Sequence, residues 1–301
     1  MDALTLAADN PLNHVVNHWF IRMDGWWIWS ANQTNLVISA LIVLIVGPWV
    51  AGKIATGAES DGHERYVTRN PFAHAIEVIC VYLRDKVIEP LLHERTARFL
   101  PILLALFFFI LINNMLGLIP LIDIQTLFAK DMVKAGQAPV GGTATQNLWV
   151  TGVLAAFAAV VINLAGIKEL GVGGYIKHLT AEAPIFVWPI IIPIEILGTF
   201  IKPIALAIRL FANMTAGHTL LAVVFMLVNV ALGGGLAIGL GVGVVSVLAG
   251  IAIWFLEIFV GFLQAFVFMF LTTVFISLLS HHGEEHDHEA EAKAVAQAGL
   301  A

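Results

Sequence analysis

Long apolar runs separated by shorter polar stretches make up most of the chain after residue 33. The runs at 34–51, about 99–120 and about 148–167 each approach the ~20 residues that a helix needs to cross ~30 Å of hydrocarbon. Each run therefore predicts a transmembrane helix. The second and third runs together predict a transmembrane helical hairpin over 99–167.

The stretch from 183 to 280 is almost unbroken apolar sequence, with a glycine-rich break at 233–243. Each half is about 45 residues long, and a continuous helix of that length would reach ~65 Å, about twice the hydrocarbon thickness. Each half must therefore be kinked, broken into two passes or strongly tilted. No internal repeat is visible along the chain, which disfavours the inverted-repeat transporter architectures.

Residues 52–98 have a different character and contain seven of the fifteen lysines and arginines of the chain. Asn70-Pro71 is typical of a helix start, with a capping side chain followed by proline at the first helical position. Apolar residues then recur at helical spacing, and polar residues occupy the other face. This pattern predicts an amphipathic helix on the membrane surface, with an apolar face of Phe72, Ala75, Ile76, Ile79, Tyr82, Leu83 and Val87.

Composition supports a membrane protein and argues against nucleic-acid binding. Hydrophobic residues make up 59% of the chain and charged residues only 12%, whereas soluble domains contain about 25% charged residues. The net charge is -6, and no basic stripe with interleaved aromatic residues is present to bind a phosphate backbone. The single cysteine, Cys80, is interpreted as a small packing residue.

The distribution of lysine and arginine predicts the topology, because these residues concentrate in cytoplasmic loops. The rule places 52–98 in the cytoplasm, and 168–182 forms a second cytoplasmic loop. The loop 121–147, and the segment before the first span, then lie on the outer side.

The two ends are expected to be tails. Residues 1–33 are predicted to form an outer-side N-terminal tail that ends in Trp26, Trp27 and Trp29, a cluster suited to the headgroup region. Residues 281–301 are predicted to form a flexible cytoplasmic tail. Its His- and Glu-rich run from His281 to Glu289 is a metal site by composition alone, and we favour a solvated acidic segment instead.

Only four formally charged side chains occur between 183 and 280, together with one histidine. A charge at bilayer depth costs ~2.5–3.5 kcal/mol on insertion scales. Glu195, Lys202 and Arg209 are spaced seven residues apart and drift by only about 40° around a helix. They therefore predict one polar stripe, which Asn213 extends by a turn. Glu257 and Gln264 are also seven apart and share a face. The charged residues are Glu195, Lys202, Arg209 and Glu257, and the histidine is His218.

Arg209 is the residue that most needs an explanation, because arginine does not deprotonate to escape burial. No acid lies three or four residues from it, so its counter-ion is expected to come from elsewhere, including another subunit. His218, nine residues on, falls on the opposite side of the helix. The alternatives are a structural pair of Glu195 with Lys202, side chains that extend to an interface, and a hydrogen-bonded core histidine at 218.

Four stretches, in the same order as in the family, resemble subunit a of F-type ATP synthases, the stator protein that faces the rotating c-ring. The most specific is the Arg-Leu-Phe-x-Asn-x-x-x-Gly block that starts at Arg209. The resemblance covers about 99–280, and residues 1–98 agree in layout more than in motif. The four stretches are Asn114 to Pro120, Gly173 to Leu179, Lys202 to His218 and Leu256 to Phe268.

The resemblance implies a fold and a set of site residues. The fold is an all-α polytopic membrane protein with upright transmembrane helices, a membrane-surface amphipathic helix and a strongly tilted C-terminal helical hairpin over 183–280. Arg209 matches the essential arginine, and Asn213 and Gln264 match its polar neighbours on the two helices. Glu195 matches an acid of the cytoplasmic access path. His218 and Glu257 match a pair lining the outer path, in the reverse order to some bacterial members.

The resemblance also implies the function and the partners. Protons would enter an outer half-channel, neutralise a c-ring carboxylate and leave through a cytoplasmic half-channel after the ring turns, while Arg209 favours the ionised carboxylate and blocks a direct leak. The expected partners are the c-ring subunits, the peripheral stalk subunit b, the rest of the complex and the lipid bilayer. The expected location is the bacterial plasma (inner) membrane, multi-pass, with the N-terminus outside and the C-terminus cytoplasmic.

No catalytic site is expected in this chain alone, and no cofactor or metal. The sequence contains no Gly-x-x-x-x-Gly-Lys-Ser/Thr run, so the chemistry of ATP would belong to a partner. Two other classes remain open: a secondary transporter, for which intramembrane charges are ordinary, and a haem- or quinone-binding subunit of a respiratory complex. Haem ligation across helices usually needs paired histidines, whereas His218 stands alone in the apolar stretch.

Overall fold

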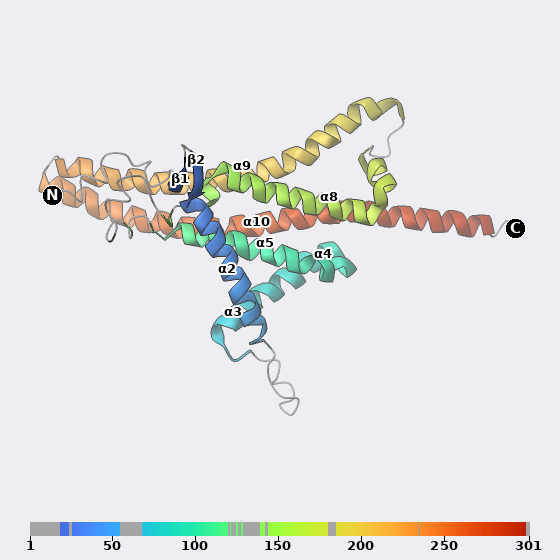
Figure 1. The fold of residues 1–301 in the computed structure, drawn as a ribbon, viewed down its shortest axis with the longest axis horizontal. Helices are drawn as coiled ribbons and strands as arrows, with labels where there is room; N and C mark the ends of the chain where they lie inside the picture. Colours follow the sequence, from blue (N-terminus) through green and yellow to red (C-terminus); the bar gives the residue numbers. More distant parts are fainter. Residues whose placement is uncertain are drawn as a thin grey trace. The chain divides into compact units, whose positions relative to one another are not determined.

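The computed structural model describes residues 19–23, 26–54, 68–119, 121, 125, 128, 139–141, 144–179, 185–233 and 235–298. Within these ranges some side chains, including those of Glu195 and Lys202, are outside the described part. Figure 1 follows the elements along the chain. Their order is β1 (Trp19–Met23), β2 (Trp26–Ser30), α2 (Ala31–Ala51), α3 (Pro71–Leu83), the π-helical turn η3 (Arg84–Ile88), α4 (Glu89–Leu92), the 3-10 turn η4 (His93–Arg95), α5 (Thr96–Gly117), the 3-10 turn η5 (Ala144–Gln146), α8 (Leu148–Leu179), the 3-10 turn η6 (Ile185–Val187), α9 (Trp188–Gly233) and α10 (Leu236–Ala298).

Among the described residues, five helical stretches are long and apolar enough to cross a membrane. This confirms the prediction of a helical, multi-pass membrane protein. The stretches at 31–51 and 148–168 correspond to the runs predicted at 34–51 and 148–167, and the last two occupy the long apolar region. The stretch at 71–117 covers most of the run predicted at 99–120 and also includes the segment predicted to be a surface helix. The five stretches cover Ala31–Ala51, Pro71–Gly117, Leu148–Lys168, Ile204–Gly233 and Ala237–Leu278.

A short two-stranded sheet precedes the first long helix, in a segment predicted to be a tail. β1 and β2 are antiparallel, with Met23 opposite Trp26 and Trp19 opposite Ser30. The sequence carried the signal: Asp24-Gly25 lies between two runs rich in aromatic residues, a pattern typical of a tight hairpin. Residues 24–25 themselves lie outside the described residues.

Two helix starts show the capping that their sequences favour. The side chain of Asn70 accepts hydrogen bonds from the backbone N–H groups of Phe72 (3.0 Å) and Ala73 (3.1 Å). This confirms the predicted cap in front of Pro71. At the start of α2, the backbone N–H of Ser30 donates to Oε1 of Gln33 at 2.8 Å, which is half of a capping box.

The chain divides into two compact units, the first formed by residues 1–74, 105–151 and 208–266. Its core includes Phe107, Ile110, Leu210 and Met214, all fully buried. The ring of Phe107 on α5 meets the edge of Phe262 on α10, with centroids 5.7 Å apart. α5, α9 and α10 therefore pack together inside this unit.

Within the first unit the later part of α9 and the early part of α10 form an antiparallel pair, visible as two adjacent helices in Figure 1. The order of contacts defines the direction. A Cβ added to Gly243 would meet Val228, and one added to Gly217 would meet Glu257. Residues later in α9 therefore contact residues earlier in α10, so the two helices are antiparallel. The two helices are joined close to the glycine-rich break at 233–243.

The second unit comprises residues 75–104, 152–207 and 267–301. Its fully buried side chains come from the segment around η3, from α5 and from the later part of α10, and they include Ile88, Leu103, Phe268 and Met269. The hydroxyl of Ser277 donates to the backbone carbonyl of Leu91 at 2.8 Å. This bond ties α10 to the α4 segment.

Three long helices differ from the expected boundaries. α9 and α10 are continuous over 46 and 63 residues, although the sequence allowed each half to break into two passes. α10 also continues to Ala298, beyond the expected end at 280, where alanine and glutamate are strong helix formers. α8 passes the expected end at 167 and is kinked at Gly171, where φ is 66°.

Candidate functional site

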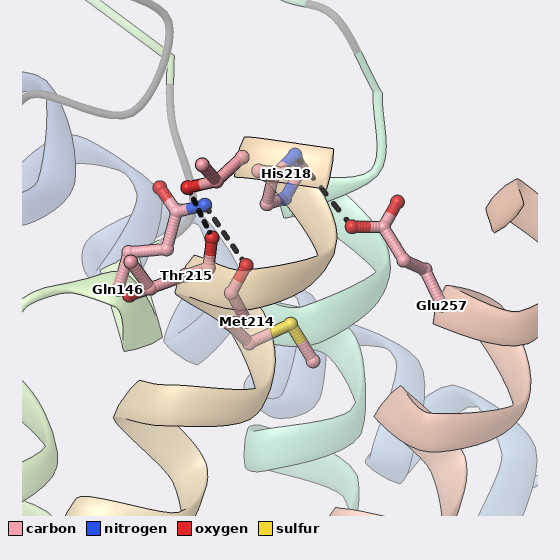
Figure 2. A network of polar contacts seen from close by, with 6 residues as sticks. Gln146, Met214, Thr215, His218 and Glu257 are labelled. Atoms are coloured by element: carbon pink, nitrogen blue, oxygen red, sulfur yellow. Dashed lines mark hydrogen bonds and ion pairs between the residues drawn. The ribbon is translucent and has the colours of Figure 1, made fainter. Parts of the chain in front are cut away.

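A buried acid and a half-buried histidine face each other between α9 and α10. Nδ1 of His218 lies 4.0 Å from Oε1 of Glu257, and the two side chains are 19% and 4% exposed. Figure 2 shows the imidazole and the carboxyl group pointing toward one another from neighbouring helices. Neither carboxyl oxygen of Glu257 has a hydrogen-bond partner among the described residues. Such a pair can hold and pass a proton in otherwise apolar surroundings.

Gly217 makes room for the acid. A Cβ at this position would lie 2.8 Å from Cγ and 2.9 Å from Cδ of Glu257, and it would collide with Oε1. Real Cβ atoms are essentially never found closer than 3.0 Å to such atoms. Any residue other than glycine would therefore displace the carboxyl group or separate the helices.

Two amide side chains make a second polar contact between the same helices. Nδ2 of Asn213 on α9 donates to Oε1 of Gln264 on α10 at 3.3 Å. Gln264 is only 1% exposed, and its Nε2 atom has no partner within the described part of the chain. Glu257 and Gln264 share the buried face of α10, as their spacing predicted.

Arg209 lies apart from both contacts. Its side chain is exposed, and it sits among apolar exposed neighbours such as Ile204 and Ile208 on α9. No described residue makes an ion pair or a hydrogen bond with the Arg209 side chain. The predicted stripe therefore divides, because Arg209 is exposed while Asn213, one turn later, is half-buried against α10. The side chain of Glu195 is outside the described residues.

Sequence reasoning missed three buried polar side chains beside this site. Nε2 of Gln146 donates to the carbonyl of Met214 at 3.3 Å. The hydroxyl of Thr145 donates to Oδ1 of Asn114 at 3.0 Å, and Nδ2 of Asn114 donates to the carbonyl of Gly261 at 3.0 Å. Asn114 belongs to one of the motif stretches, but residues 145 and 146 fall in or next to a polar loop and carry no periodic signal.

The described residues contain no candidate cluster for binding a metal ion. No group of three or more histidine, cysteine, aspartate and glutamate side chains is gathered there. The side chains of the His-rich run after residue 280 lie outside the described part, so the solvated acidic segment stays a prediction and the metal site stays its alternative.

Apolar helices that enclose an acid, a histidine and several amides, all inside one compact unit, define a multi-pass membrane protein with a polar site between its helices. The family described as ATP synthase A chain matches residues 34–277. The chain therefore belongs to the ATP synthase A chain family, whose members take part in ATP synthesis and proton transport as part of the ATP synthase complex.

Relatives in three bacteria agree with this assignment. The chain is 41% identical over 277 residues to ATP synthase subunit a 2 of Chlorobaculum tepidum, covering 91% of this chain and 70% of that protein. It is 39% identical over 233 residues to ATP synthase subunit a of Myxococcus xanthus, covering 75% and 67%. It is 37% identical over 254 residues to ATP synthase subunit a of Chlorobium phaeobacteroides strain DSM 266, covering 82% and 67%.

Proposed function

We propose that this chain is the ion-translocating stator subunit of a rotary ATP synthase. In this proposal Arg209 acts on a carboxylate of a rotor c-ring, and two half-channels lead protons to and from that carboxylate. The observation that carries the proposal is the position of Arg209. It is an exposed guanidinium on an apolar helix face, without an ion-pair partner in the described part of its own chain.

The energetics of Arg209 argue for a partner subunit. A permanent charge at bilayer depth is costly, and an arginine inside a membrane is normally paired. The exposed apolar residues around it, including Ile204, Ile208 and Leu220, suit contact with another apolar helix. A rotor helix that carries a carboxylate would supply both the apolar surface and the anion. A guanidinium next to that carboxylate favours its ionised form, so the proton is released there.

The outer half-channel is assigned to His218 and Glu257. Their separation of 4.0 Å exceeds the ~2.6–3.2 Å of a direct proton-transfer contact, and one water molecule can bridge such a gap. A proton delivered through this pair would neutralise the rotor carboxylate. The neutral acid can then turn into lipid without the cost of a buried charge.

The remaining polar groups complete the path. Asn213 and Gln264 lie between the level of Arg209 and that of the pair, where their amides can orient water. Glu195 is assigned to the cytoplasmic half-channel, into which the proton leaves. The fixed positive charge of Arg209 repels a proton that would otherwise cross directly between the half-channels. Each charge that crosses 100 mV releases ~2.3 kcal/mol, so several protons must pass for each ATP.

The finer features of the fold follow from helix length. At ~1.5 Å per residue, the continuous α9 and α10 are more than twice as long as the hydrocarbon is thick, which favours a strongly tilted hairpin. For α3, Phe72 and Tyr82 are exposed, and the exposed Arg84 and Asp85 form an ion pair at 2.6 Å. An apolar surface next to a solvated charge pair suits a helix in the headgroup region.

Topology and partners complete the proposal. The basic segment 52–98 is assigned to the cytoplasm with the segments 168–182 and 281–301, while residues 1–33 are assigned to the outer side. The membrane is the bacterial plasma (inner) membrane. Subunit b of the peripheral stalk and the c-ring are the expected neighbours, and copurification of this chain with a ring of small two-helix subunits and an ATP-hydrolysing head would support this assembly.

The test is Arg209→Ala in the assembled complex. We expect the complex to assemble and proton-driven ATP synthesis to be lost. The matched control is Arg84→Ala, because Arg84 is also exposed but has Asp85 as its partner, and synthesis should persist in that variant. ATP synthesis in inverted membrane vesicles, driven by an imposed proton gradient, measures both. Normal synthesis by Arg209→Ala at normal complex levels would overturn the proposal.

A further inference from the structure

The buried segment Thr145-Gln146 is hydrogen-bonded directly to α9 and reaches α10 through Asn114 of α5. Gln146 is 8% exposed and Thr145 is fully buried. The Gln146 amide donates to the carbonyl of Met214 on α9, and Thr145 is bonded to Asn114, whose amide donates to the carbonyl of Gly261 on α10. Two consecutive residues of η5 therefore connect to α9 and α10 through three hydrogen bonds.

The two carbonyl groups belong to the turns that carry the site. In an α-helix each carbonyl accepts the N–H of the residue four positions later. The Met214 carbonyl is therefore the helical acceptor for the N–H of His218, whereas the Gly261 carbonyl accepts from Ala265 and the Gly261 N–H donates to the carbonyl of Glu257, one turn earlier. A carbonyl oxygen has two lone pairs and can accept both donors. Figure 2 shows the Gln146 amide directed at Met214, one turn from His218.

Close packing holds the same level of the two helices together. A Cβ added to Gly261 would lie 3.3 Å from Cβ of Asn114 and 3.5 Å from Cε of Met214. With little free space and with directed hydrogen bonds, a shift of one helix would move the other. We propose that Gln146 is a positioning residue, which holds the turn of α9 that bears His218 at its working distance from Glu257. This inference rests on the proposed role of that pair in proton transfer.

The distance between the pair explains why positioning matters. At 4.0 Å the two groups are within reach of one bridging water, and a further separation of about 1 Å would break that bridge. Misplacement of reacting groups by about 1 Å can cost on the order of a hundredfold in rate. Loss of the Gln146 bond alone allows a smaller shift, so we expect roughly a tenfold loss of proton flux.

The test uses Gln146→Met, which keeps the length of the side chain and removes the donor. Gln125→Met is the matched control, because the Gln125 amide also donates to a backbone carbonyl, that of Val140, which belongs to neither α9 nor α10. Passive proton flux is measured in vesicles that contain the assembled complex stripped of its ATP-hydrolysing head, at matched amounts of the chain. We expect roughly tenfold lower flux for Gln146→Met and unchanged flux for the control. Gln146→Asn, which keeps an amide donor, should recover part of the loss.

A double-mutant comparison with Glu257→Gln separates positioning from simple destabilisation. If Gln146 acts through the pair, Gln146→Met should lower flux in the native background and add nothing once Glu257 has been replaced. An equal loss in both backgrounds, or flux equal to that of the Gln125→Met control, would overturn the inference and leave the proposed function intact. Normal flux with Glu257→Gln alone would instead overturn the assigned half-channel, and this inference with it.

Thr145→Val is a second variant for the same test, to be used if Gln146→Met does not accumulate in the membrane. Valine has nearly the same shape as threonine but cannot donate to Asn114. The same comparison with Glu257→Gln then applies, with a smaller expected loss, because the bond from Gln146 to α9 remains. Equal losses in both backgrounds would again contradict positioning.

Discussion

Replacement of Gly217 by alanine is a sharp test of the geometry between α9 and α10. The new Cβ would lie 2.8 Å from Cγ of Glu257, and ordinary contact begins at 3.4 Å. The acid must therefore retreat by about 0.6 Å, or the helices must separate by a similar amount. Cγ is near the root of the side chain, so a rotation of the carboxyl group alone does not relieve this contact.

The expected effect is on proton flux more than on folding. Over-packing of this kind costs about 1–3 kcal/mol of stability, which the replacement of a helical glycine by alanine offsets by about 0.5–1 kcal/mol. A displacement of about 0.6 Å between groups that exchange a proton corresponds to roughly a tenfold lower rate, given on the order of a hundredfold for 1 Å. We expect Gly217→Ala to assemble and to lower proton flux about tenfold.

The assay is passive proton flux through vesicles that contain the assembled complex, with the amount of chain matched between variants. Gly152→Ala is the control, because a Cβ at Gly152 in α8 would meet nothing within 4 Å. That variant should keep normal flux. If Gly217→Ala also keeps normal flux, the position of the Glu257 carboxyl group against α9 does not control proton transfer, and the geometric reasoning fails.

Three further predictions concern other contacts. Asn213→Leu and Gln264→Leu should each reduce proton flux. The double variant should lose less flux than the sum of the two single losses, because the two amides are hydrogen-bonded to each other. Additive losses in the flux assay would contradict a shared role. Asn70→Ala should destabilise the start of α3 by about 1 kcal/mol, visible as a lower melting temperature of the purified complex with synthesis retained. Ser277→Ala should lower that temperature too, since it leaves the Leu91 carbonyl without its donor; an unchanged temperature would show that the bond adds no stability.

The sequence predicted the features of this structure that depend on local patterns along the chain. Runs of apolar residues predicted the spans, and Asn70-Pro71 predicted the start of α3. The spacing of Glu257 and Gln264 predicted that they share one face. In each case the information lies within a few turns of one helix, where side-chain direction follows from 100° per residue.

The remaining parts depend on residues far apart in the chain. Gln146 meets Met214, 68 positions later, only in the folded protein, and nothing in the polar loop before α8 marks that residue as buried. The requirement for glycine at 217 comes from Glu257, 40 positions later. The β1–β2 hairpin was also not predicted, although Asp24-Gly25 between two runs rich in aromatic residues is typical of a tight turn.

The geometry of a single helix accounts for the separation of two kinds of charge. Arg209 and His218 are nine residues apart, so at 100° per residue they point in opposite directions and lie about 13.5 Å apart along the axis. One side of α9 therefore presents a permanent charge on an exposed apolar face, and the other presents a titratable group to Glu257. Had the spacing been seven or eleven, the guanidinium would share a face with the histidine and would repel any proton that arrives there. In the proposed mechanism, this separation would let a proton approach the pair while Arg209 faces the rotor helix.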